Sequence, residues 1–158
     1  MVNAVGGTDL MLVDFGRSID LVRTENQGSD PLRTQFTGSI AAEDMECVAM
    51  REGRHWGVDL DFFGVAASSF ILLFGSHIEV IQDRSTRKWR PNKPFRRYWQ
   101  REIWDHLFDS LLNFDSKTDK YCLGEVRAHF DGYIEGKQRK KEIAAYLHQL
   151  HTHLPTKR

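Results

Sequence analysis

The chain has 158 residues, a length that suits one domain with a modest core and argues against two. Its 22 Lys and Arg residues balance its 22 Asp and Glu residues, so the formal net charge is zero. That balance gives no whole-chain reason to expect a nucleic acid or an anionic membrane as partner. The hydrophobic content of 41% is typical of a globular protein and argues against a disordered chain.

Three local features concern the cellular compartment. Cys47 and Cys122 lie far apart and form no CxxC pair, which favours a reduced intracellular setting. The N-terminus lacks the charged and apolar regions of a signal peptide. The longest apolar run, at residues 65–74, is too short and too interrupted by serine to span a bilayer. We therefore expect a soluble intracellular protein without a membrane partner.

The first third of the chain predicts little regular structure. Residues 10–15 are a short, mostly apolar run closed by Gly16, which predicts a short strand that ends in a turn. Residues 17–55 are irregular, with turn residues at 28–31 and at Gly38, and the stretch "AAEDMECVAM" predicts a helical turn or two. A connection of this length within a compact domain is usually functional.

The remainder of the chain predicts helices. Residues 58–75 carry apolar side chains on nearly every face, which predicts a helix buried at the protein centre and stopped by Gly75. Residues 83–98 are basic, contain two prolines and predict a loop. Amphipathic patterns predict further helices over 99–113, 121–134 and 139–153. The expected fold is mainly α: one short strand, a long segment, and about four helices around a buried central helix.

The stretch "LMLVDFGRSIDL", residues 10–21, has two interpretations. In the first, Asp14 and Gly16 belong to a turn that ends a strand, with Gly16 at a positive φ. In the second, Asp14 is a metal-binding residue that presents Mg²⁺ to the phosphates of ATP, and Phe15 packs to orient it. A tripeptide such as Asp-Phe-Gly often occurs by chance. The order of apolar strand, Asp-Phe-Gly, long segment and buried helix nevertheless favours the second interpretation.

Longer stretches carry a more specific resemblance. They are "LVDFGRSIDL", "ECVAMREGRHWGVDLDFFGVAASSFILLFGSHIEV" and "PFRRYWQREIWDHLFDSLLN", which together run from about Leu10 to Asn113. They resemble the last part of the kinase domain in the BUB family of mitotic spindle checkpoint serine/threonine kinases. The block with Trp, Asp-x-Phe-Gly-x-Ala-Ala and Leu-Phe-Gly is specific, because other kinases carry a D-x-W-S-x-G pattern there. The resemblance implies a kinase-like C-terminal lobe over residues 1–153, followed by a tail at 154–158.

The resemblance also implies roles for individual residues. Asp14, Phe15 and Gly16 would bind the cofactors ATP and Mg²⁺ in the full-length protein, with Asp14 as the metal ligand. Asp61 would match the Asp that holds the catalytic-loop backbone, although it also fits a helix N-cap. Trp56 would pack structurally at the entrance to the central helix, and residues 33–50 would form the substrate-docking part of the activation segment.

The chain departs from the family pattern in two respects. Ala49 stands where the family usually has a Glu that anchors the activation segment to an Arg of the late helices. In addition, no glycine-rich phosphate loop, strand Lys or H-R-D-x-x-x-x-N catalytic loop is found in the chain, so it contains no expected catalytic residue. We therefore expect a partial kinase domain that needs the missing N-terminal half and is inactive alone.

Two functions follow from the resemblance. The first is the C-terminal part of a checkpoint kinase that acts at the kinetochore, in the nucleus at the chromosome centromere, on protein substrates and with checkpoint proteins as partners. The second is a non-catalytic, pseudokinase-type interaction domain of a BUB-related protein. An upstream sequence with an intact HRD motif and strand Lys would favour the first.

Two other stretches contain residue types that suit binding. The stretch "RSTRKWRPNKPFRRYWQR", residues 84–101, interleaves basic and aromatic residues. Such a pattern is suited to binding a partner protein, an acidic substrate or single-stranded nucleic acid. Nucleic acid is the less favoured of these, since charge runs are usually solvated faces. His148, His151 and His153 have partly helical spacing for a zinc site, but no Cys or nearby carboxylate completes a tetrahedral set, so an exposed helix end is favoured.

Overall fold

The computed structural model describes residues 18–20, 34–38, 45–97, 99–116 and 123–153. Its elements in chain order are α1 (Val48–Arg51), α2 (Asp59–Phe74), β1 (Val80–Gln82), β2 (Trp89–Pro91), α3 (Arg101–Leu112), α4 (Leu123–Glu135) and α5 (Lys137–His153). The prediction of a mainly α fold is confirmed. The strand predicted at residues 10–15 lies outside the described residues.

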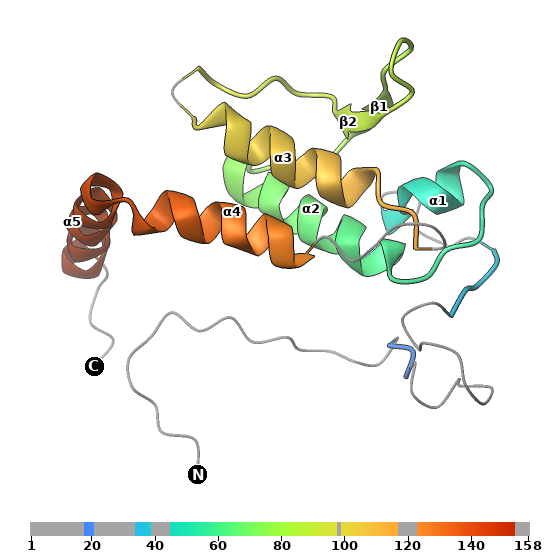
Figure 1. Cartoon of the computed structure of the whole chain (residues 1–158), viewed down its shortest axis with the longest axis horizontal. Coiled ribbons are helices and arrows are strands. Elements are labelled where there is room, and N and C mark those ends of the chain that lie inside the picture. The colour runs from blue at the N-terminus through green and yellow to red at the C-terminus, as the bar shows by residue number, and fades with distance from the viewer. Residues whose placement is uncertain (1–17, 21–33, 39–44, 98, 117–122, 154–158) are drawn as a thin grey trace.

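Helix α2 lies at the centre of the described structure, with α3 running alongside it (Figure 1). Asp59 and Asp61 stand in its first turn, where carboxylates interact favourably with the helix dipole. The helix ends at Gly75, whose φ of 66° lies in the left-handed region that glycine adopts without strain. The sequence prediction of a helix over 58–75 is therefore confirmed to within one residue at each end.

Aromatic side chains fill the contact between α2 and α3. Phe70 and Phe108 are both almost completely buried, and their ring centroids lie 6.3 Å apart in an edge-to-face arrangement. Phe95, which precedes α3, stacks on Phe108 at 5.5 Å. This packing explains why the amphipathic pattern over 99–113 correctly predicted α3, because its apolar stripe faces α2.

The prediction of a loop over residues 83–98 was wrong in part. Strands β1 and β2 form an antiparallel hairpin in which Val80 pairs with Pro91. The turn is closed by the Asp83 carboxylate, which accepts hydrogen bonds from the backbone N–H groups of Ser85 and Thr86. Pro91 is tolerated because it ends a two-stranded ribbon and so interrupts no further ladder.

One face of α2 is exposed despite its apolar residues. Leu72 is 87% exposed, Val65 47% and Ile71 42%, whereas Phe62 and Phe63 on the opposite face are buried. Within the described residues, the helix that the sequence predicted to be buried at the protein centre is therefore buried on one side and exposed on the other.

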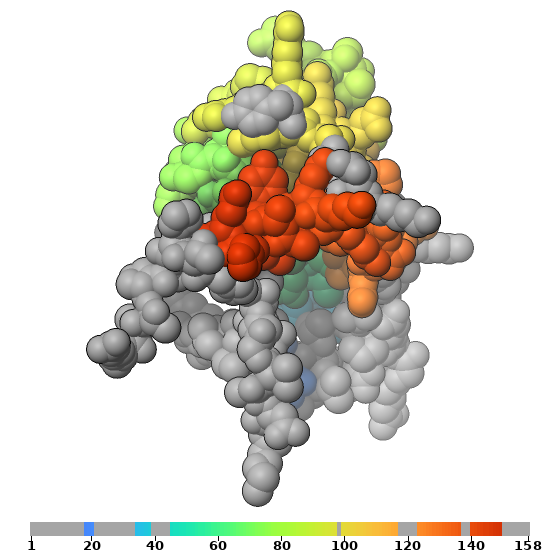
Figure 2. Space-filling view, turned by 90° about the vertical axis from the view of Figure 1, so that its left-hand side faces the viewer, coloured from blue at the N-terminus to red at the C-terminus, as the bar shows by residue number. Residues whose placement is uncertain are grey.

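Helices α4 and α5 extend away from this core. In α4 only Val126 is buried, and Phe130 contacts Trp104 of α3 at 5.5 Å between ring centroids. Helix α5 packs on α4 (Figure 1) and, in the view of Figure 2, lies across the middle of the face. Within the described ranges, no helix is both long enough and apolar enough to cross a membrane.

Candidate functional site

The proposed metal-binding residues are not described by the structure. Asp14, Phe15 and Gly16 lie in the segment 1–17, outside the described residues. Within the described ranges, no group of three or more His, Cys, Asp or Glu side chains could hold a metal ion. The described residues therefore do not test a site for ATP and Mg²⁺, and the assignment of Asp14 stays a prediction.

Trp56 connects the entrance of α2 to the segment at residues 34–38. Its backbone pairs with Phe36 through two hydrogen bonds of 2.7 and 3.1 Å, and the two rings lie 5.1 Å apart. Its indole N–H donates to the carbonyl of Gly38 at 2.9 Å. At the next position, a Cβ on Gly57 would come within 2.7 Å of the Thr34 carbonyl oxygen, so this close approach requires glycine. Part of the predicted substrate-docking segment is thereby held against the start of α2.

Asp59 is the buried carboxylate at the start of α2. It is 5% exposed, and its two oxygens accept hydrogen bonds from the backbone N–H groups of Gly57 at 2.8 Å and Ser116 at 3.3 Å. One side chain thus ties the entrance of α2 to the segment that follows α3. Sequence reasoning did not single out this role, because the second donor lies 57 residues away.

Asp61 occupies a different environment from Asp59, although only two residues separate them. Its side chain is exposed, and it makes no hydrogen bond to another described residue. Partial burial nevertheless raises the pKa of its carboxyl group. Helical spacing places it on the same face as Val65 and Leu72, which are four and eleven residues further on. A carboxylate therefore lies at one end of the exposed apolar face of α2.

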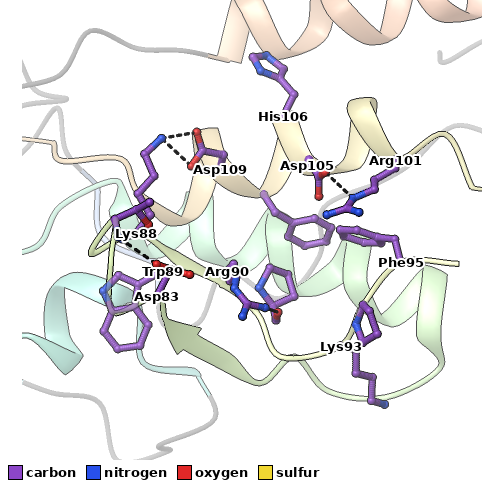
Figure 3. Close-up of a pocket in the computed structure, with 14 residues that line it drawn as sticks. Asp83, Lys88, Trp89, Arg90, Lys93, Phe95, Arg101, Asp105, His106 and Asp109 are labelled. Carbon is purple, nitrogen blue, oxygen red and sulfur yellow. Dashed lines mark hydrogen bonds and ion pairs between the residues drawn. The ribbon is translucent and has the colours of Figure 1, made fainter. Parts of the chain in front are cut away.

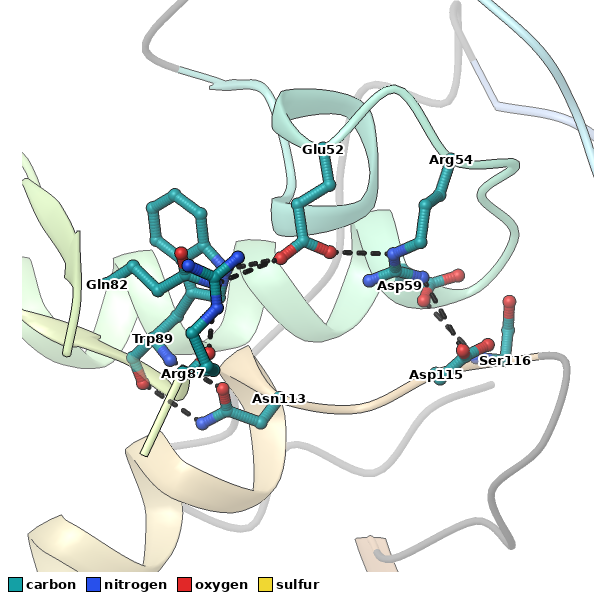
Figure 4. A network of polar contacts seen from close by, with 9 residues as sticks. All are labelled: Glu52, Arg54, Asp59, Gln82, Arg87, Trp89, Asn113, Asp115 and Ser116. Carbon is teal, nitrogen blue, oxygen red and sulfur yellow. Dashed lines mark hydrogen bonds and ion pairs between the residues drawn. The ribbon is translucent and has the colours of Figure 1, made fainter. Parts of the chain in front are cut away.

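A polar network holds α1 against the β1–β2 hairpin (Figure 4). The Glu52 carboxylate accepts hydrogen bonds from the Trp89 indole N–H and from the Arg54 Nε, both at 2.7 Å. Arg54 also reaches the Asp115 carboxylate at 3.6 Å. Partial burial pushes the pKa of Glu52 upward, but the bonds from Trp89 and Arg54 outweigh this and hold it below its ordinary value. These contacts link three segments that are distant in sequence.

Asn113 completes the attachment of the hairpin. Its side-chain oxygen accepts from the Trp89 backbone N–H at 2.6 Å, and its amide donates to the Trp89 carbonyl at 3.0 Å. The end of α3 thus binds the β2 backbone in the manner of a further strand.

Ala49 shows how the chain differs from the family pattern at α1. Its side chain is buried at 1% exposure, in a position without room for a solvated carboxylate. The acidic anchor of α1 is instead Glu52, three residues later, which forms an ion pair with Arg54. Sequence reasoning missed Glu52, and the spacing Glu-x-Arg was the one signal that could have pointed to it.

Comparisons with known proteins identify the family. The chain is 39% identical over 104 residues to the spindle assembly checkpoint serine/threonine-protein kinase BUB1 of Saccharomyces cerevisiae. It is 34% identical over 134 residues, or 85% of its length, to the mouse mitotic checkpoint kinase BUB1, and 32% identical over 129 residues to the BUB1 kinase of Arabidopsis thaliana. The crystal structure of the BubR1 kinase domain matches 75% of the chain with a TM-score of 0.69 and 28% identity. The chain belongs to the BUB family of checkpoint kinases. No family model matches it.

The match is to a limited part of these BUB proteins. The chain covers 10% of the S. cerevisiae kinase, 12% of the mouse kinase and 23% of the Arabidopsis kinase. It covers 35% of the BubR1 kinase-domain chain. Its fold is that of the C-terminal region of a BUB-family kinase domain, with α2 as the central helix.

Proposed function

We propose that this chain supplies the C-terminal lobe of a BUB-type serine/threonine kinase that acts in the mitotic spindle checkpoint. The observation that carries the proposal is the joint similarity in sequence and fold to BUB1 proteins and to the BubR1 kinase domain. In this proposal, the described residues form the framework that holds the activation segment, and Asp14 contributes to binding Mg²⁺ and ATP.

The cofactors and the chemistry are carried over from the family. ATP supplies the phosphoryl group and Mg²⁺ neutralises the charge that develops on it. The described residues would contribute to catalysis by holding other groups in position. Trp56 and Asp59 fix the start of α2, and the segment at 34–38 packs against that start. The groups expected to bind the phosphates and to accept the substrate proton would come from sequence outside these 158 residues. Kinetochore localisation and protein substrates belong to the same proposal.

A second candidate function is a non-catalytic interaction domain, and Ala49 favours it. A chain that no longer needs to regulate its activation segment can lose the acidic anchor at this position. The structure offers one argument against it, since Glu52 ties α1 in place by other contacts.

Sequencing of the transcript upstream of the Met1 codon separates the two candidates. The kinase proposal predicts an open reading frame that continues upstream and encodes a strand Lys and an H-R-D-x-x-x-x-N loop. A continuous upstream frame in which the Lys and the Asp are replaced would support the interaction domain. An upstream frame without any kinase-like sequence would contradict both.

A further inference from the structure

A groove lies between the β1–β2 hairpin and α3 and shares Trp89 with the polar network around Glu52 (Figure 3). It has a volume of about 550 Å³ and is formed by β2, the segment that follows it, and one side of α3. Prolines and the Phe95 and Phe108 rings supply its apolar part, and charged side chains surround them. The groove can therefore accept a partner that carries both apolar and charged groups.

The cations in this groove are not equally engaged. Lys88 pairs with Asp109 at 2.8 Å and Arg101 pairs with Asp105 at 2.9 Å. For Arg90, in contrast, no described carboxylate lies within ion-pair distance, and its guanidinium makes only a 3.5 Å contact with the neighbouring carbonyl of Pro91. Figure 3 shows Arg90 between Trp89 and Lys93, below the two ion pairs. An exposed guanidinium with open donors in a groove is suited to a carboxylate.

The chain segment that contains Arg90 is rich in cations. The segment 84–101, "RSTRKWRPNKPFRRYWQR", contains eight Lys and Arg residues and no Asp or Glu, although the chain as a whole has no net charge. Four of these cations line the groove together with three carboxylates, and two of the carboxylates are already paired with Lys88 and Arg101. The Arg90 guanidinium is therefore the group in the groove that is best placed to attract a negatively charged partner.

We propose that the groove between β2 and α3 binds an acidic, partly apolar segment of a partner protein, with Arg90 as the residue that pairs with its carboxylate. Apolar side chains of the segment lie against Pro94 and Phe95. The Arg101–Asp105 pair at the rim is exposed on both sides and can open, so that Arg101 contacts a second carboxylate. The proposal concerns binding and does not rest on catalysis.

The groove fits a peptide better than a nucleic acid. Its aromatic rings are already engaged within the protein: Phe95 stacks on Phe108, and the Trp89 indole donates to Glu52. Bases would therefore find few open aromatic faces on which to stack. Asp105 and Asp109 on α3 leave room for isolated negative charges beside Arg90, which suits a peptide whose carboxylates are separated by apolar side chains better than a continuous phosphate backbone.

Fluorescence anisotropy on the full chain tests the proposal with a labelled peptide in which glutamate and leucine alternate. The variants Arg90→Glu and Arg84→Glu form a matched pair, because they change the net charge equally within the same basic segment. Arg84 is exposed near the hairpin turn and does not line the groove. We expect Arg90→Glu to weaken binding about tenfold or more, and Arg84→Glu to weaken it about twofold at most.

A third variant is expected to change binding in the opposite direction, an effect that loss of folding cannot produce. Asp105→Asn removes the carboxylate that competes for Arg101, so we expect it to tighten peptide binding about two- to fivefold, which an unfolded protein cannot do. Equal weakening by the two arginine variants would contradict the proposal, because it would show charge attraction without a groove. No detectable peptide binding, or tighter binding of a single-stranded oligothymidylate than of the peptide, would also overturn it.

Discussion

Replacing Asp59 by alanine tests the central packing of α2. The substitution leaves two buried backbone N–H groups, those of Gly57 and Ser116, without their acceptor. Each such group costs about 1–3 kcal/mol, and the longer 3.3 Å bond contributes less, so the expected loss in the free energy of unfolding is about 2–4 kcal/mol. This is a large share of the roughly 5–15 kcal/mol that a domain typically has.

Asp61→Ala is the matched control for this experiment. Asp61 stands in the same first turn of α2 but is exposed, so its removal sacrifices only the interaction with the helix dipole, about 0.3–1 kcal/mol. Asp59→Ala loses that interaction as well, so the difference between the two variants isolates the buried hydrogen bonds. Urea unfolding followed by tryptophan fluorescence gives both values. Equal destabilisation by the two substitutions would refute the assignment of Asp59 as the buried acceptor.

Further predictions follow from exposure, charge and composition. Leu72→Glu should reduce aggregation of the chain in size-exclusion chromatography without lowering its unfolding midpoint, because Leu72 is 87% exposed; a lower midpoint would show that the side chain is covered. The pKa of Glu52 is depressed in the folded state, so its stabilisation is present above its ordinary pKa of 4.5 and is lost as the pH falls through the lower folded value. With Glu52→Gln, the unfolding midpoint should therefore fall less steeply as the pH is lowered into the acid range. An equally steep fall in the native protein and the variant would contradict this. Pure 158-residue chain should not turn over ATP, and phosphate release that Asp14→Asn abolishes would count against that expectation.

The helices were predictable because their signals are local. In α2 an apolar run ends at Gly75, and both features lie within the segment itself. The same holds for α3, whose apolar stripe repeats at helical spacing. A pattern of this kind needs no knowledge of the partner surface, so the observed bounds lie within about two residues of those expected.

The hairpin and the buried carboxylate were not predictable in this way. β2 contains Arg90 and Pro91, which favour a loop, and it forms because Asn113 binds the Trp89 backbone and β1 pairs with it. Likewise, nothing local distinguishes Asp59 from Asp61. Only the approach of the segment after α3 makes one of them a buried acceptor. Both features depend on contacts between distant segments.

The sequence also did not predict which face of α2 is exposed. The sequence indicates an apolar helix, and the structure identifies which side chains remain exposed, namely those at Val65, Ile71 and Leu72. Their spacing places them on the face that also carries Asp61. This arrangement could not be read from a run in which nearly every position is apolar.

Phosphoryl transfer is the measurement that tests the proposed function most directly. The protein translated from the complete transcript should be assayed for transfer of the γ-phosphate of ATP to a serine- and threonine-containing protein substrate, with Asp14→Asn as the paired variant. We expect measurable transfer by the native protein and a loss of at least about a hundredfold in the variant, because the proposal assigns Asp14 as the residue that binds the metal. Equal transfer by the two proteins, or none by either, would contradict the proposal that this chain completes an active checkpoint kinase.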